Sequence, residues 1–225
     1  MIRVITITHQ CGSGGAELGC QIAHKLGWDL VDWQLIERVA RVADLDSSSA
    51  QRFDEKAARW CGILTAQGID LAEICAPVVP RWLGQLDYES AHALATQLIR
   101  AAADFGECVI VACGAQFLLR SRVDVLNVLT YAPIEERVTR VQGRQPEYHD
   151  VPAFIKKTDS QTAQYFIDHY RGDWLQRNLY HLCVNTSIGL DLAATLIDHA
   201  VVVADDICAP PPQKEFCLCH LPDQP

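Results

Sequence analysis

The sequence THQCGSGGAELG, residues 8–19, joins two segments of different character. Residues 4–7 before it, VITI, are all β-branched, which is typical of a buried strand. Residues 15–26 have the apolar spacing of a helix. Glycines between a strand and a helix let backbone N–H groups approach phosphate oxygens, and the helix N-terminus adds the positive end of its dipole. The stretch therefore predicts a phosphate-binding loop at residues 12–15.

Two specific loop patterns and one structural alternative fit this stretch. The dinucleotide fingerprint Gly-x-Gly-x-x-Gly fits at two glycines but meets Glu17 at the third. The pattern Gly-x-x-x-x-Gly-Lys-Ser/Thr fits with Gly14 as its second glycine. In that register His9, Gly15 and Ala16 replace the first glycine, the lysine and the magnesium-binding hydroxyl residue. The backbone of a phosphate site is kept without its side chains, and a turn that only packs the helix against the strand remains the alternative.

Composition limits the class of protein. A chain of 225 residues, 49% hydrophobic and 21% charged, is long enough to bury a full core and suits one domain. A formal net charge of −9 argues against nucleic acid or an anionic membrane as the main partner. The first residues lack the apolar core of a signal peptide, and no apolar run is long enough to span a membrane. We therefore expect a cytoplasmic protein whose ten cysteines are mostly reduced core residues.

Short apolar runs alternate with longer helical patterns along most of the chain. The runs predicted as strands are residues 4–8, 28–31, 109–112, 125–131 and 180–184. The helical patterns cover residues 15–26, 34–42, 48–60, 88–105, 134–141, 152–170 and 190–203. This alternation indicates a parallel sheet covered by helices on both faces, with ligands bound beyond the carboxyl ends of the strands.

We expect a single domain over residues 1–204. Residues 62–87, which contain Pro77 and Pro80, break the alternation and indicate an irregular or short-helical insertion. Residues 205–225 form a tail, because the prolines at 210–212 cannot continue a helix. The spacing of the cysteines and the histidine in this tail matches no common zinc pattern, so the sequence predicts no metal site made of side chains.

Several motifs, in order, resemble those of the cytidylate kinase-like family of P-loop proteins. The family begins with a strand, then Arg-Gln-(Tyr/Phe)-Gly-Ser-Gly-Gly-Arg-Glu, a helix ending in Lys-Leu-Gly, and an aspartate after the second strand. In this sequence Gln10, residues 12–15, Glu17, residues 25–27 and Asp32 keep those places. Further similar stretches are FDEK at 53–56, VIVACGAQFLLR at 109–120, VLTYAPIEERVTR at 128–140, IKKTD at 155–159 and VNTS at 184–187. The resemblance covers roughly residues 3–200.

The resemblance implies a three-layer α/β nucleotide-kinase fold: a five-stranded parallel sheet flanked by helices, with a helical lid at about residues 141–160. It implies a phosphotransferase that uses ATP and Mg²⁺ and has a nucleoside monophosphate resembling CMP as acceptor. It gives phosphate-binding roles to Gly12, Ser13, Gly14, Gly15, Ala16 and Glu17, an acceptor-binding role to Asp32, lid roles to Arg137, Arg144 and Asp159, and catalytic roles to Arg140 and Lys157.

Some of these roles have structural alternatives. Asp32 is also placed to cap the helix that begins at Gln34. Arg137 and Arg140 share one helix face, which is consistent either with a phosphate clamp or with a solvated face paired to the neighbouring Glu135 and Glu136.

The sequence departs from the family where the family carries positive charge. Uncharged residues or histidine stand at four positions where the family has arginine: His9, Ala16, Cys113 and Thr162. Phosphoryl transfer depends on positive charge around the transferred group. We therefore expect either a kinase of weak activity or a non-catalytic nucleotide-binding or regulatory protein with the same fold. A dinucleotide-dependent oxidoreductase fits less well, because the later motifs do not suit it.

Overall fold

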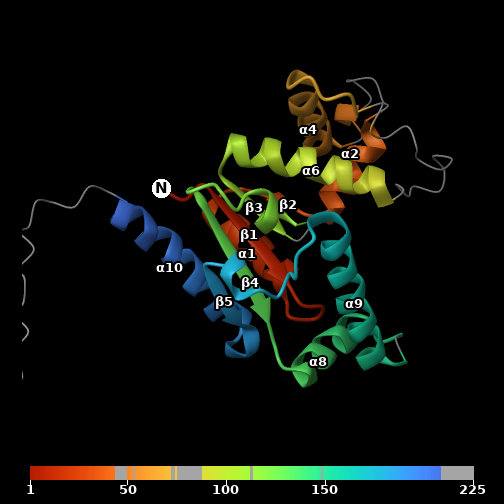
Figure 1. The fold of residues 1–225 in the computed structure, drawn as a ribbon, viewed down its shortest axis with the longest axis vertical. Helices are drawn as coiled ribbons and strands as arrows, with labels where there is room; N and C mark the ends of the chain where they lie inside the picture. The colour runs from red at the N-terminus through yellow and green to blue at the C-terminus, as the bar shows by residue number, and fades with distance from the viewer. Residues whose placement is uncertain are drawn as a thin grey trace, which may run out of the picture.

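Five parallel strands form the centre of the molecule, in the order β2-β3-β1-β4-β5 (Figure 1). They are β1 (Val4–His9), β2 (Asp29–Val31), β3 (Cys108–Val111), β4 (Val125–Tyr131) and β5 (Leu182–Asn185). The computed structural model describes residues 1–43, 50–52, 54–71, 74, 88–111, 114–147 and 149–208. The predicted α/β fold with a five-stranded parallel sheet is confirmed.

The central strand β1 brings the glycine loop to the middle of one sheet edge. Ile5 pairs in register with Val109 of β3 on one side and with Leu126 of β4 on the other. Every residue from Val4 to Thr8 is buried, because helices cover both faces of the sheet. The loop that follows β1 is therefore flanked by the carboxyl ends of β3 and β4, where α/β proteins bind their ligands.

Helices form a layer on each face of this sheet (Figure 1). The first face is covered by α1 (Gly15–Leu26) and α10 (Leu190–Cys208). The second is covered by α2 (Trp33–Val42), α4 (Glu55–Ala66), α6 (Tyr88–Phe105) and the short α7 (Ala115–Leu118). Two further helices, α8 (Ile134–Arg144) and α9 (Val151–Tyr170), follow β4 and pack on each other through a small apolar cluster of their own. They contain the segment predicted as the lid.

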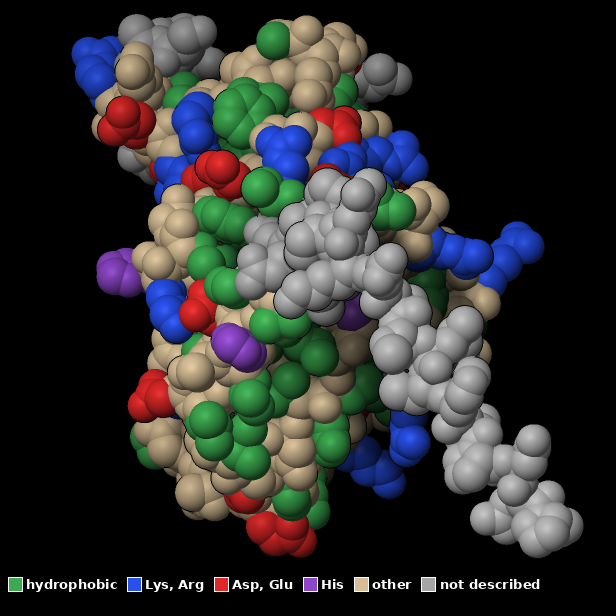
Figure 2. All heavy atoms as spheres, turned by 90° about the vertical axis from the view of Figure 1, so that its left-hand side faces the viewer, with side chains coloured by type: hydrophobic (Ala, Val, Ile, Leu, Met, Phe, Trp, Pro, Cys, Tyr) green, Lys and Arg blue, Asp and Glu red, His purple; other side chains and the backbone are tan. Residues whose placement is uncertain are grey.

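The outer face of α10 carries several exposed apolar side chains among polar ones. Leu192, Leu196, Val202 and Val203 are exposed there, while Ala193 and Ile197 of the same helix are buried against the sheet layer. Figure 2 shows hydrophobic side chains gathered over this side of the molecule. Within the described residues, no helix combines the length and the apolar character needed to cross a membrane.

The cysteines whose side chains are described are free thiols, as predicted: Cys11, Cys20, Cys61, Cys108 and Cys183. The prediction that most of them are core residues is wrong for these five, because only Cys108 is buried, and Cys20 and Cys183 are exposed. Burial raises the pKa of the Cys108 thiol to about 12. This thiol stays protonated at neutral pH and is a core residue.

The predicted helix at residues 48–60 is not continuous: residues 50–52 and 55–60 are helical, but the helix is interrupted at Asp54. Asp54 has an extended backbone (φ −156°, ψ 95°), and its carboxylate accepts a hydrogen bond from the N–H of Ala57, so a new helix begins at Glu55. That helix, α4, runs to Ala66, inside the segment predicted to be an insertion. Much of that segment, residues 72–73 and 75–87, lies outside the described residues. The tail predicted to begin at residue 205 starts too early, because α10 continues to Cys208, and residues 209–225 lie outside the described residues.

Asp54 also joins α4 to α2. Arg38 of α2 donates to both carboxylate oxygens of Asp54, from Nε at 2.5 Å and from Nη2 at 2.8 Å. This bidentate contact with Arg38 lowers the pKa of Asp54 to about 2. The pKa in the folded state is therefore below the value of about 3.9 expected in the unfolded chain. The pair stabilises the fold above that value, and its contribution is lost as the pH falls through about 2.

We expect Asp54→Asn to flatten the acid dependence of stability. The free energy of unfolding of the wild-type protein should fall as the pH is lowered from about 4 to about 2 by more than that of Asp54→Asn. Urea denaturation at a series of pH values measures both curves. Arg38→Gln should flatten the curve in the same way, because it removes the cause of the shift. Equal acid dependence in all three proteins would contradict this account of the pair.

Candidate active site

The glycine loop leaves β1 at His9 and enters α1 at Gly15. Gly12 (φ 78°) and Gly14 (φ 83°) have left-handed backbone conformations that side chains disfavour. The N–H of Ser13 donates to the carbonyl oxygen of Gln10 at 3.0 Å. In the part of the chain that the structure describes, the N–H groups of Gly12 and Gly14 donate to no other group. The N–H groups of the first turn of α1 likewise have no acceptor within the helix.

The glycines also allow close packing around the loop. A Cβ atom on Gly15 would lie 2.3 Å from Cβ of His9 and 2.8 Å from Oγ1 of Thr130. A Cβ atom on Gly14 would lie 2.7 Å from Cδ2 of Leu190. The position that carries lysine in the common phosphate loop therefore has no room here for a side chain. The glycines therefore serve close packing, as the structural alternative predicted. They also leave backbone N–H groups that have no acceptor among the described residues.

Arg137 holds the loop from the side of α8. Its side chain is only 8% exposed. Its Nε donates to the carbonyl oxygen of Cys11 at 2.7 Å, and its Nη2 donates to the carboxylate of Asp159. The other oxygen of Asp159 accepts the N–H of Cys11 at 2.9 Å. One ion pair, between a buried arginine and a half-buried aspartate, therefore fixes the loop to both α8 and α9.

Arg140 holds the loop from the other side. Its Nη1 lies 3.3 Å from the carbonyl oxygen of Ser13 and 2.9 Å from Oγ1 of Thr186, and its Nη2 donates to the carbonyl oxygen of Thr186 at 2.8 Å. Thr186 begins η3 (Thr186–Ile188), directly after β5, and its hydroxyl also donates to the carbonyl oxygen of Ser13 at 2.7 Å. Arg140 also contacts Glu136, one turn away, at 3.3 Å. Both arginines are thus engaged with carbonyl and carboxylate oxygens.

The remaining predicted site residues do not all lie beside the loop. Arg144 pairs with Glu17 across the exposed end of α1. Asp32 caps α2 by accepting a hydrogen bond from the N–H of Leu35 at 2.8 Å. It directly follows β2, and β3 lies between β2 and β1. Ala16 is exposed on the first turn of α1, and Lys157 is exposed on α9. The position of Cys113 lies outside the described residues.

Two residues beside the loop, Thr130 and Thr186, were not singled out from the sequence. The hydroxyl of Ser13 is buried and lies 3.2 Å from the carbonyl oxygen and 3.1 Å from Oγ1 of Thr130. Thr130 pairs in register with His9, so it stands opposite the start of the loop. The sequence feature that could have identified Thr130 is its position as a polar residue near the carboxyl end of a buried strand. Thr186 lies in the VNTS motif, which had no assigned role.

The side chains in the loop itself carry no positive charge. Burial lowers the pKa of His9 below its ordinary value, although Gln10 and Asp159 oppose the shift, so this histidine is neutral near pH 7. Burial and then the charge of Asp159 raise the pKa of the Cys11 thiol, which stays protonated. Positive character in the loop therefore comes from backbone N–H groups and the helix dipole.

The residues present do not fit a Mg²⁺ ion held directly by side chains. Ala16 has no hydroxyl, and the hydroxyl of Ser13 is turned toward Thr130. Among the described residues, no group of three His, Cys, Asp or Glu side chains is placed to hold a metal ion. We therefore assign no step of a reaction to a bound metal.

A cavity of about 550 Å³, which we call the α9 cavity, adjoins the loop. It is lined by Gln10, by Ile134 and Arg137 of α8, by Pro152, Ile155, Lys156, Asp159, Ser160 and Ala163 of α9, and by Trp174 and Leu175.

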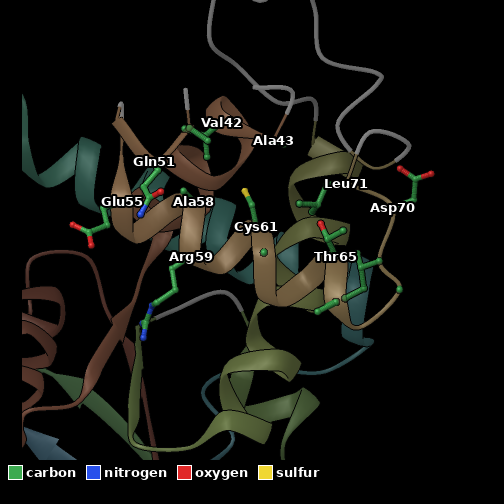
Figure 3. Close-up of a pocket in the computed structure, with 15 residues that line it drawn as sticks. Val42, Ala43, Gln51, Glu55, Ala58, Arg59, Cys61, Thr65, Asp70 and Leu71 are labelled. Carbon is green, nitrogen blue, oxygen red and sulfur yellow. The ribbon is translucent and has the colours of Figure 1, made fainter. Parts of the chain in front are cut away.

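A second cavity, of about 1080 Å³, lies between α2 and α4 and is lined only by residues between 42 and 71 (Figure 3). In Figure 3, Arg59 points away from the other labelled side chains, and it pairs with Asp29 at the start of β2. No residue of the glycine loop lines this cavity. We assign the site to the loop because uncommitted N–H groups and a cavity meet there.

Comparisons with known proteins agree with this fold. Residues 4–188 match the profile of a family described as the cytidylate kinase-like family. An uncharacterized protein from Eubacterium ventriosum has a similar structure, with a TM-score of 0.63 at 17% identity, covering 90% of this chain and 99% of that one.

Two kinases align over similar lengths with lower scores. Shikimate kinase from Acinetobacter baumannii has a TM-score of 0.47 at 14% identity, covering 90% of this chain and 94% of its own. A gluconokinase from Sinorhizobium meliloti has a TM-score of 0.48 at 14% identity, covering 91% and 95%. No curated protein matched the sequence.

Proposed function

The chain belongs to the cytidylate kinase-like family, and on that premise we propose that its glycine loop binds the phosphates of ATP for transfer to a nucleoside monophosphate. The observation that carries this proposal is the loop itself. Gly12 and Gly14 take left-handed conformations immediately before α1, and their N–H groups are not used within the described part of the protein. Backbone donors at a helix N-terminus suit a phosphate without a side-chain cation.

In this proposal the protein's own residues bind and orient rather than supply charge. The N–H groups of Gly12, of Gly14 and of the first turn of α1 stabilise the negative charge of the donor phosphates. Arg137 and Arg140 hold the loop in shape through the carbonyl oxygens of Cys11 and Ser13. The segment 141–160 acts as a lid that excludes water once both substrates are bound. Asp32, to which the family pattern gives an acceptor-binding role, is engaged in capping α2 and is assigned no contact with the acceptor here. The protein acts in the cytoplasm on small-molecule nucleotides.

This site has little positive charge available for catalysis. To contact the phosphates, Arg140 has to give up its hydrogen bonds to Ser13 and Thr186. Lys157 reaches the phosphates only when the lid moves. The engagement of both arginines therefore favours a second candidate function, a nucleotide-binding or regulatory protein that transfers phosphate slowly or not at all. Both candidates share the same ATP site, which can be tested separately from catalysis.

We expect Ala16→Glu to weaken ATP binding about tenfold while leaving the fold intact. Residue 16 is exposed, and a carboxylate is favourable in the first turn of a helix. Next to a bound phosphate, however, two like charges about 5 Å apart cost about 1 to 3 kcal/mol at a protein surface. Gly14→Val is a poorer test, because its side chain would collide with Leu190. Isothermal titration with ATP measures the dissociation constant.

Cys20→Glu is the matched control, since residue 20 is exposed on α1 one turn further from the loop. It adds the same charge to the same helix and should change ATP affinity far less. Equal effects of the two variants, or none, would mean that ATP does not bind at the loop.

A further inference from the structure

We propose that the α9 cavity binds the phosphoryl acceptor, a nucleoside monophosphate, and that the ammonium group of Lys156 pairs with the phosphate of that acceptor. The proposal rests on the proposed function, because it assumes that the loop holds the donor. It adds the place of the acceptor and a residue, within the IKKTD motif, to which the family resemblance assigns no role.

The position and size of the cavity suit an acceptor. Its volume of about 550 Å³ lies within the range of about 300 to 1,000 Å³ that is usual for small-molecule sites. Gln10, the first residue of the glycine loop, forms part of its wall. A ligand in the cavity therefore lies beside the loop that holds the donor phosphates, as transfer between two bound substrates requires.

The charges around the cavity leave one cation unpaired. Arg137, Lys156 and Asp159 are the ionisable residues that line it. Arg137 and Asp159 form an ion pair and are also bound to the backbone of Cys11. Lys156 is exposed, and no acceptor for its Nζ is found among the residues that the structure describes. The cavity therefore carries a net positive charge, which selects an anionic ligand.

The rest of the wall is largely apolar, which suits the base and sugar of a nucleotide. Ile134 and Leu175 are large apolar side chains, yet they are 44% and 42% exposed at this cavity. Trp174, beside them in the lining, is buried. A bound ligand would cover the two exposed side chains and remove apolar surface from water.

Lys157 provides an internal comparison. It carries the same charge on the next residue of α9 and is also exposed, but it does not line the cavity. Successive residues of a helix point about 100° apart, so the two ammonium groups leave α9 in different directions. Lys157 is the lysine to which the family resemblance assigns a role, whereas Lys156 is the lysine that lines the cavity. Replacing each lysine separately therefore distinguishes the motif from the geometry.

The test measures binding of CMP and of ATP, by isothermal titration, to full-length wild-type protein, Lys156→Ala and Lys157→Ala. We expect Lys156→Ala to raise the dissociation constant for CMP about tenfold or more, because a charge-assisted contact with phosphate is lost. Lys157→Ala should change it less than about twofold. Lys156→Ala should bind ATP as the wild-type protein does. Both lysines are exposed, so neither substitution is expected to unfold the protein.

Each other outcome overturns the proposal. Equal losses in the two variants, a loss in Lys157→Ala alone, or no effect in either would show that Lys156 does not pair with the acceptor. Absence of CMP binding to the wild-type protein would show that the cavity does not take this acceptor. ATP binding that responds to Ala16→Glu would still stand in those cases, so failure of this proposal is distinct from failure of the proposed function.

Discussion

Replacing Arg137 with alanine is expected to lower the free energy of unfolding by about 3 to 5 kcal/mol, the usual cost of removing one partner from a buried ion pair. The side chain of Asp159, which is 25% exposed, would lose its charged partner. The carbonyl oxygen of Cys11 would lose the donor that Arg137 provides at 2.7 Å. Urea denaturation followed by circular dichroism measures the loss.

Arg144→Ala is the matched control for this prediction. Arg144 lies on the same helix and pairs with Glu17, but the two side chains are 53% and 45% exposed. Exposed pairs contribute about 0 to 1 kcal/mol, so the control should lose no more than that. The double variant Arg137→Ala/Asp159→Ala should recover part of the loss, because it leaves no uncompensated charge. Equal stability of the Arg137 and Arg144 variants would show that the buried pair does not fix the loop.

The sequence predicted the sheet and the first helix closely, because their signals are local. The predicted helix at residues 15–26 matches α1, which is bounded by left-handed glycines at positions 14 and 27. The strand at 125–131 matches β4, a mostly apolar segment that is buried from Val125 to Thr130. Apolar period and glycine position together determined these elements.

The error at residues 48–60 arose where an N-cap lies inside a helical pattern. Asp54 reads as one more polar residue on the outer face of a helix. In the structure it caps α4 and also binds Arg38, sixteen residues away. The second contact depends on how α2 packs against α4, which no local pattern shows.

The partners of the site residues were the least predictable part. The sequence offered Glu135 and Glu136 as partners for the arginines of α8. Glu136 does contact Arg140, one turn away, but Arg137 pairs with Asp159 on the next helix. That pair depends on the angle between two helices joined by a short connection. The same angle decides that Lys156, rather than Lys157, lines the cavity.

The central claim is that this protein keeps the backbone of a phosphate site and has lost the side-chain cations that speed transfer. The loss of a single catalytic arginine can slow phosphoryl transfer by about 10³ to 10⁵, and losses within one site need not multiply. Four positions that carry arginine in the family lack it here: His9, Ala16, Cys113 and Thr162. The double variant Ala16→Arg/Thr162→Arg restores charge at two of them. Cys20→Arg adds a cation to α1 one turn further from the loop and serves as the control.

Single-turnover transfer from ATP to CMP, measured with and without these substitutions, tests this claim most directly. We expect the wild-type protein and Cys20→Arg to transfer more slowly than about 0.1 per second, at least a thousandfold below the upper end of the kinase range. Ala16→Arg/Thr162→Arg should be about tenfold faster or more. Wild-type transfer at about 1 to 100 per second, the rate typical of kinases, would contradict the claim and show that the remaining basic residues supply the missing charge.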